Sequence, residues 1–188
     1  MAKKVYQLKI TLKGISPAIW RRILVKPDIS LVDFHRIIQT TMGWTNSHLH
    51  LFKNGHEEYS PAEFEVEDTK NSRAFKLNKL LKHVNDRILY EYDFGDGWEH
   101  NILLEKIVEV DDKEQIPKCL KGKRNCPPED CGGIWGYENF LQIISDPQHE
   151  EYEETMEWGG EEFDPEYFNI EEINKLLSEK DYGCIWLE

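Results

Sequence analysis

The chain has 188 residues, of which 39% are hydrophobic and 12% aromatic, and it carries a net charge of −13 at pH 7. This length supports one domain with a buried core, and this apolar content excludes a disordered chain. Its apolar runs are too short to span a membrane, and its start lacks the apolar run of a signal peptide, so we expect a cytoplasmic protein without membrane contacts. Its net negative charge disfavours binding to nucleic acid.

The first part of the sequence predicts a β-hairpin followed by a helix. Residues 5–13 alternate between apolar and polar side chains, and a second strand is expected at residues 18–25 after a turn. Ser30 and Asp33 form an approximate capping box for a helix with one apolar stripe. Gly43 is the expected C-cap of this helix.

Two more hairpins follow in the sequence. Strands at residues 48–53 and 56–60 flank Asn54-Gly55, and strands at residues 87–94 and 98–108 flank a Gly-Asp-Gly turn. Residues 61–74 are expected to form a loop. This order indicates an α+β protein with a β-grasp (ubiquitin-like) mixed sheet of four or five strands and one crossing helix.

The second half is predicted to complete the same domain. We divide the chain into a β-grasp-like core (residues 1–110), an ordered loop rich in Cys, Gly and Pro (residues 111–135) and a C-terminal helical extension packed on that domain (residues 136–188). Helices are expected at residues 137–145, at residues 149–158 before Gly159-Gly160, and from the capping residue Asn169 to about Ser178.

The charge is uneven along the chain. Residues 1–26 carry seven Lys or Arg and no acid, so the remainder has a net charge of −20. We expect this basic start to be the solvated face of a hairpin that balances the acidic tail. A local contact with an anion is the alternative.

Two polar clusters could support a binding site. Asp93, Asp96 and His100 surround the Gly-Asp-Gly turn, where carboxylates and an imidazole could bind a divalent ion or exchange protons. His48 and His50 lie two residues apart in a strand, so both imidazoles face the same side and could share a metal. The alternatives are an ordinary turn, in which Asp caps loop amides, and a solvated edge strand.

Three cysteines are candidate zinc ligands. Cys119, Cys126 and Cys131 are spaced more widely than the close pairs of common zinc sites, and a fourth ligand such as His100 or His149 would have to come from elsewhere in the fold. Buried thiols packed in the core are the alternative.

Five motifs occur in one order along the chain. They are residues 15–22 (ISPAIWRR), residues 34–39 (FHRIIQ) with Gly43-Trp44, residues 48–50 (HLH) with Phe52, residues 92–98 (YDFGDGW) with His100, and residues 126–133 (CPPEDCGG) with Gly136-Tyr137. Together they resemble the plasmid pRiA4b ORF-3-like family, and the C-terminal Trp158, Phe163 and Phe168 extend the resemblance to nearly the whole chain.

This resemblance implies which residues of the chain occupy motif positions of the family. It does not imply a reaction, because the family has no established activity. The implied positions are Trp20, Arg21, Arg22, His35, Gln39, Trp44, His48, His50, Asp93, Asp96, Trp98, His100, Cys126, Glu129, Asp130, Cys131, Gly132, Gly133 and Tyr137. Several are polar side chains that a core does not require, which favours a functional site.

The sequence therefore predicts a module that binds a protein or a small-molecule ligand. The candidate binding residues are Trp44, His48, His50, Asp93, Asp96, Trp98 and His100. No recognisable catalytic set is present, which favours a role other than catalysis. Two alternatives are a zinc-binding protein, structural or hydrolytic, and a nucleic-acid-associated protein linked to mobile elements that uses its basic start.

Overall fold

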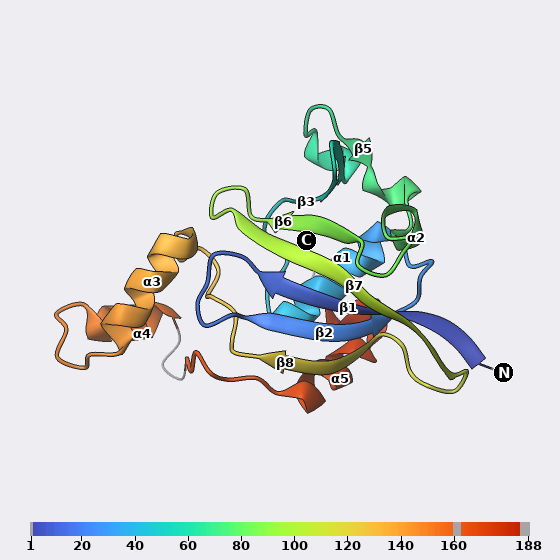
Figure 1. The fold of residues 1–188 in the computed structure, drawn as a ribbon. Helices are drawn as coiled ribbons and strands as arrows, with labels where there is room; N and C mark the ends of the chain where they lie inside the picture. The colour runs from blue at the N-terminus through green and yellow to red at the C-terminus, as the bar shows by residue number, and fades with distance from the viewer. Residues whose placement is uncertain (1, 160–162, 185–188) are drawn as a thin grey trace.

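A single mixed sheet organises the fold of the computed structural model, which describes residues 2–159 and 163–184 (Figure 1). Its strand order is β5-β4-β3-β6-β7-β1-β2-β8. The strands are β1 (Ala2–Leu12), β2 (Trp20–Val25), β3 (His50–Asn54), β4 (Glu57–Ser60), β5 (Lys70–Asn71), β6 (Arg87–Tyr92), β7 (Trp98–Asp111) and β8 (Lys118–Lys123).

The centre of the sheet is the long antiparallel pair of β1 and β7. Apolar residues of β1 such as Leu8 and Ile10 are fully buried, whereas Lys9 between them lies on the other face, as the alternation predicts. The described strands pair antiparallel except for the short parallel pair of β4 and β5.

The helix α1 (Leu31–Met42) covers one face of the sheet (Figure 1). Its caps confirm the sequence prediction: the Ser30 side chain accepts the Asp33 N–H, and Gly43 adopts a left-handed conformation with φ of 99°. Its apolar stripe, which includes Phe34 and Ile38, is fully buried in the common core.

Of the other described helices, α3 (Gly133–Ile144) is as long as α1 at 12 residues, and the rest are shorter. These are α2 (Leu77–Leu80), α4 (Tyr152–Gly159) and α5 (Ile170–Leu177), with 3₁₀ turns at Ala62–Phe64, Ser72–Ala74 and Lys180–Gly183. α5 packs on α1 and β8, whereas α3 and α4 pack on each other beyond the end of the sheet (Figure 1). Gly160, predicted to end the helix at 149–158, lies outside the described residues. None of the described helices has the length and apolar character needed to cross a membrane.

The structure confirms the α+β class and enlarges the predicted sheet. Eight strands replace the expected four or five, and a β-grasp assignment is not confirmed. The prediction that residues 111–135 form a loop is wrong for residues 118–123, which form the edge strand β8. Three lysines and a glycine leave this segment without a clear apolar–polar alternation, so it carries no strand signal in the sequence. Pairing with β2 holds it in the sheet, and the Asn174 side chain of α5 hydrogen-bonds both the N–H and the C=O of Cys119.

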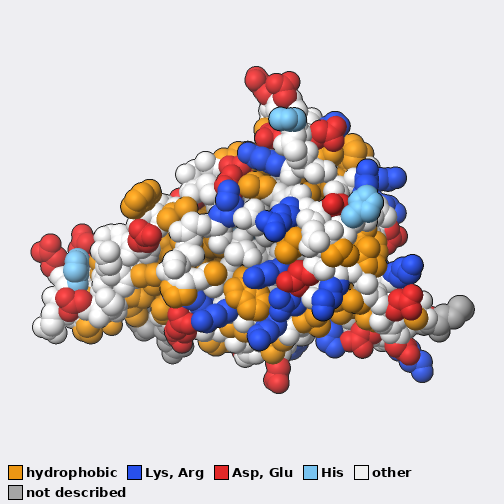
Figure 2. All heavy atoms as spheres, in the orientation of Figure 1, with side chains coloured by type: hydrophobic (Ala, Val, Ile, Leu, Met, Phe, Trp, Pro, Cys, Tyr) orange, Lys and Arg blue, Asp and Glu red, His pale blue; other side chains and the backbone are white. Residues whose placement is uncertain are grey.

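The open face of the sheet carries many of the basic side chains (Figure 2). Lys9 and Arg22 lie over the ring of Trp20, at 5.1 and 5.2 Å from its centroid. Arg22 forms a bidentate ion pair with Glu105 of β7. Part of the positive charge of the hairpin is therefore balanced by a carboxylate of the sheet itself. From the sequence alone, we expect the acidic tail to balance this charge.

Candidate functional site

Two histidines from different elements stack against each other at the edge of α1. His35 lies on the second turn of this helix and His50 begins β3. Their rings are parallel within 6°, with centroids 3.4 Å apart, and both residues are buried. Burial lowers the pKa of His35 to about 4 and that of His50 well below its usual value, so both rings are neutral at pH 7.

A buried network fixes the His35 ring. Gln39 Nε2 donates to the Tyr90 hydroxyl at 3.0 Å, and this hydroxyl lies 2.8 Å from His35 Nδ1. The Tyr90 proton is then available to Nδ1, which leaves His35 Nε2–H to donate to Asn46 Oδ1 at 2.7 Å. All hydrogen-bonding atoms of the His35 ring are thus engaged.

His50 is different because its Nδ1 atom is buried and, within residues 2–159 and 163–184, has no hydrogen-bond partner. This histidine lines a cavity of about 240 Å³, which we call the histidine cavity. The residues that line it are Val32, His35, Asn46, Ser47, His48, Leu49, His50, Pro61, Glu63, Phe64 and Arg73. Glu63 and Arg73 form an ion pair with each other.

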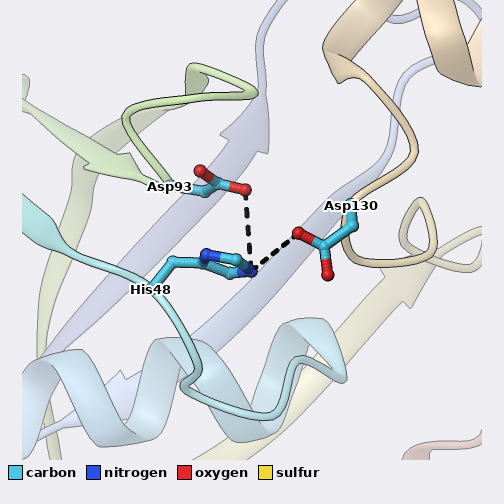
Figure 3. A group of neighbouring side chains, drawn as sticks. All are labelled: His48, Asp93 and Asp130. Atoms are coloured by element: carbon cyan, nitrogen blue, oxygen red, sulfur yellow. Dashed lines mark ion pairs between the residues drawn. The ribbon is translucent and has the colours of Figure 1, made fainter.

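Next to this cavity, His48 faces two carboxylates that come from distant parts of the chain (Figure 3). Its Nε2 atom lies 3.7 Å from Asp93 Oδ2 and 3.3 Å from Asp130 Oδ1. Asp93 follows β6, and its other oxygen, Oδ1, accepts the N–H groups of Gly95 and Asp96 in the turn. Asp130 belongs to the loop between β8 and α3. We call these three residues the His48 cluster.

The loop that carries Asp130 is held against the sheet by its neighbour Glu129. The Glu129 carboxylate accepts hydrogen bonds from the Tyr92 hydroxyl at 2.5 Å, from the Thr45 N–H at 3.2 Å and from the Ser47 hydroxyl at 3.0 Å. Trp44 Nε1 also donates to the Pro127 carbonyl of this loop at 3.1 Å. The contacts join segment 44–48 to the Asp130 loop and thereby position His48 opposite Asp130.

Asp96 anchors the end of the same loop and lies outside the His48 cluster. Its Oδ2 atom accepts the N–H of Gly132 at 3.2 Å. The backbone carbonyl of Asp96 approaches Gly133 so closely that a Cβ atom at Gly133 would lie 2.5 Å from it. Asp96, a predicted binding residue, thus contacts the loop that carries Asp130 and is not one of the three residues of the His48 cluster.

Trp98 and His100 are core residues below the site. Both are almost fully buried, and the His100 ring packs edge-on against Trp44 at 5.1 Å. Burial lowers the pKa of His100 to about 4. Trp98 Nε1 and His100 Nε2 are buried and have no hydrogen-bond partner among the residues that the structure describes.

The three predicted zinc-ligating cysteines are largely buried thiols. Burial raises the pKa of Cys119 to about 11 and the pKa values of Cys126 and Cys131 to about 12, which keeps them protonated at neutral pH. A group of three metal-ligating side chains with all ligand atoms within 4.8 Å occurs once in the described chain, and it is the His48 cluster rather than the cysteines.

The structure thus combines an α+β fold around one large sheet with a cavity and a carboxylate–imidazole cluster at one edge. A family model described as plasmid pRiA4b ORF-3-like protein matches residues 4–172, and the chain belongs to this family. It is 36% identical to the uncharacterized protein y4hQ of Sinorhizobium fredii strain NGR234, over 99% of this chain and 96% of that protein. Its fold is similar to the crystal structure of a protein of unknown function from Methanosarcina mazei Go1, with a TM-score of 0.82 and 40% identity over 89% of this chain and 96% of that one.

Sequence spacing alone singles out neither His35 nor Asp130. His35 looks like one more polar residue of an amphipathic helix, and Asp130 like a turn residue in a polar loop. The signal that includes both is the family motif match, through FHRIIQ and CPPEDCGG. Of the seven predicted binding residues, the structure places His48 and His50 at the cavity and brings Asp93 to His48.

Proposed function

We propose that the protein binds a small, uncharged and partly apolar molecule in the histidine cavity. The observation that carries this proposal concerns His50, which lines a cavity of about 240 Å³ and whose buried Nδ1 atom has no hydrogen-bond partner in the described chain. Leaving a buried polar atom unpaired costs about 1–3 kcal/mol, and a ligand group could recover this energy.

The walls of the cavity support a ligand with an apolar body. Val32, Leu49, Pro61 and Phe64 contribute apolar surface, a composition typical of small-molecule sites. The Phe64 ring also packs edge-on against His50 at 5.2 Å, so an aromatic ligand would find ring partners there.

The charges at the cavity favour an uncharged ligand. Burial keeps the imidazoles of His35 and His50 neutral at pH 7. The guanidinium of Arg73 is already paired with Glu63. A hydroxyl or amide group is therefore the best complement to His50 Nδ1, because a neutral nitrogen stabilises an anion poorly.

The test is a fragment screen of the isotope-labelled full chain by NMR, in a buffer with a chelator that removes metal ions. The library consists of uncharged aromatic alcohols and amides. Binding is expected to shift the amide signals of Val32, Leu49 and Phe64. His50→Phe keeps a ring that can stack but removes Nδ1, and it should weaken a confirmed fragment by roughly tenfold.

His83→Phe is the matched control because His83 is exposed and lies outside the cavity. It should leave fragment affinity unchanged. The proposal is wrong if the screen produces no shifts at the cavity residues, or if His50→Phe binds each fragment as well as the unmodified chain while circular dichroism shows the same fold.

A further inference from the structure

We propose that the His48 cluster is a binding site for one divalent transition-metal cation, held by His48 Nε2, Asp93 Oδ2 and Asp130 Oδ1. The site adjoins the histidine cavity through His48, which lines that cavity, whereas Asp93 and Asp130 are not among the lining residues. Figure 3 shows the two carboxylates facing the His48 ring. It does not depend on whether the cavity binds a ligand.

The distances in the cluster match those between ligands of a small cation. Zinc lies about 2.0–2.2 Å from imidazole nitrogen and carboxylate oxygen, so two ligands at a tetrahedral angle are about 3.4 Å apart. His48 Nε2 lies 3.3 and 3.7 Å from the two carboxylate oxygens, and all three ligand atoms lie within 4.8 Å of one another. Small side-chain adjustments would therefore complete the coordination.

The hydrogen-bonding state of His48 Nε2, the ring nitrogen that faces the carboxylates, also favours a cation. His48 Nε2 is buried, and in the portion of the chain that the structure describes it forms no hydrogen bond. Asp130 Oδ1 lies 3.3 Å away without forming a hydrogen bond to it. A lone pair directed at a cation between two carboxylates would satisfy this nitrogen.

Burial of Asp93 supplies a second, independent reason for a cation. Only 10% of its side-chain surface is exposed, whereas 71% of the Asp130 side chain is exposed. A buried carboxylate is costly unless a positive charge or hydrogen bonds compensate it, and the turn amides bind only its Oδ1 atom in the contacts described above. Its Oδ2 atom is directed at His48 (Figure 3).

The ligand types select the class of metal. One imidazole with two carboxylates suits zinc and related transition metals, whereas magnesium and calcium prefer oxygen ligands alone. Three protein ligands leave coordination positions open, and the exposed side of Asp130 gives water access to them. Such an open site resembles catalytic rather than structural zinc sites in its coordination.

The experiment is a calorimetric titration of the untagged, chelator-treated full chain with zinc chloride, and separately with magnesium chloride. The expected result is about one zinc per chain and much weaker magnesium binding. His48→Ala, Asp93→Asn and Asp130→Asn should each weaken zinc binding by roughly tenfold or more. Asp130→Asn is the decisive variant because the residue is exposed, so its fold should persist.

The matched control uses another histidine–aspartate pair. His83 Nδ1 lies 3.8 Å from Asp86 Oδ2 on the surface, and no described residue supplies a third ligand there. His83→Ala should therefore bind zinc like the unmodified chain. The proposal is overturned if no stoichiometric zinc binding occurs, or if the His48-cluster variants bind zinc normally. Zinc binding that is lost in Cys126→Ser but retained in Asp130→Asn would also overturn it, in favour of the cysteines.

Discussion

Replacing Tyr90 by Phe would test the buried network behind the histidine cavity. Tyr90 is fully buried, and its hydroxyl is the hydrogen-bond partner of both His35 Nδ1 and Gln39 Nε2. Its ring packs on Phe52 with centroids 5.0 Å apart, and Phe preserves this contact. The substitution removes two hydrogen bonds at about 1 kcal/mol each and leaves two buried groups unpaired, so we expect a loss of about 3 kcal/mol in the free energy of unfolding.

The assay is urea denaturation followed by circular dichroism, together with thermal unfolding. For a chain of this length, a loss of about 3 kcal/mol corresponds to a decrease of about 6–12 °C in Tm. Tyr167→Phe is the matched control: it removes a hydroxyl that donates to Glu172 at 2.6 Å, but Tyr167 is 47% exposed, and the loss should stay within about 0.5 kcal/mol. The reasoning fails if the two variants are equally stable.

Two further perturbations test the buried histidines and the anchored loop. His35 and His100 have folded pKa values of about 4, below the unfolded value of about 6.5, so the unfolded chain binds more protons. The contribution of these two neutral imidazoles to the free energy of unfolding is complete above pH 6.5. It decreases as the pH falls towards 4, by up to about 3 kcal/mol for each histidine. Urea denaturation midpoints that stay constant between pH 7 and 5 would refute this. Gly133→Ala should destabilise the chain more than Gly55→Ala, because both glycines have positive φ but a Cβ at Gly133 would also meet the Asp96 carbonyl at 2.5 Å, whereas Gly55 faces open space. Equal Tm values for the two variants would contradict the proposed close approach.

Local interactions explain why much of the fold could be predicted from the sequence. The hydrogen bond from the Asp33 N–H to Ser30 and the left-handed Gly43 both act within one helical turn of the helix ends, so neighbouring residues determine them. The hairpin of β1 and β2 likewise follows from alternation and a short connection. Strand β8 was missed because its pairing with β2 and its contact with Asn174 are both long-range.

The spacing of His48 and His50 does not define what surrounds each ring. Spacing predicts that His48 and His50 face the same side, yet the first faces two carboxylates and the second stacks on His35. The irregular segment before β3 permits this difference, because strict strand alternation begins only at His50.

The helix caps, the hairpins, the α+β class and the family could all be predicted, since they depend on neighbouring residues or on ordered motifs. The order of the strands in the sheet and the pairing of distant polar groups could not, because both depend on how the whole chain packs. His48, Asp93 and Asp130 come from three separate segments, and the Glu129 contacts with Tyr92 and segment 44–48 bring them together. Such contacts depend on chain closure and packing, for which local sequence carries no signal.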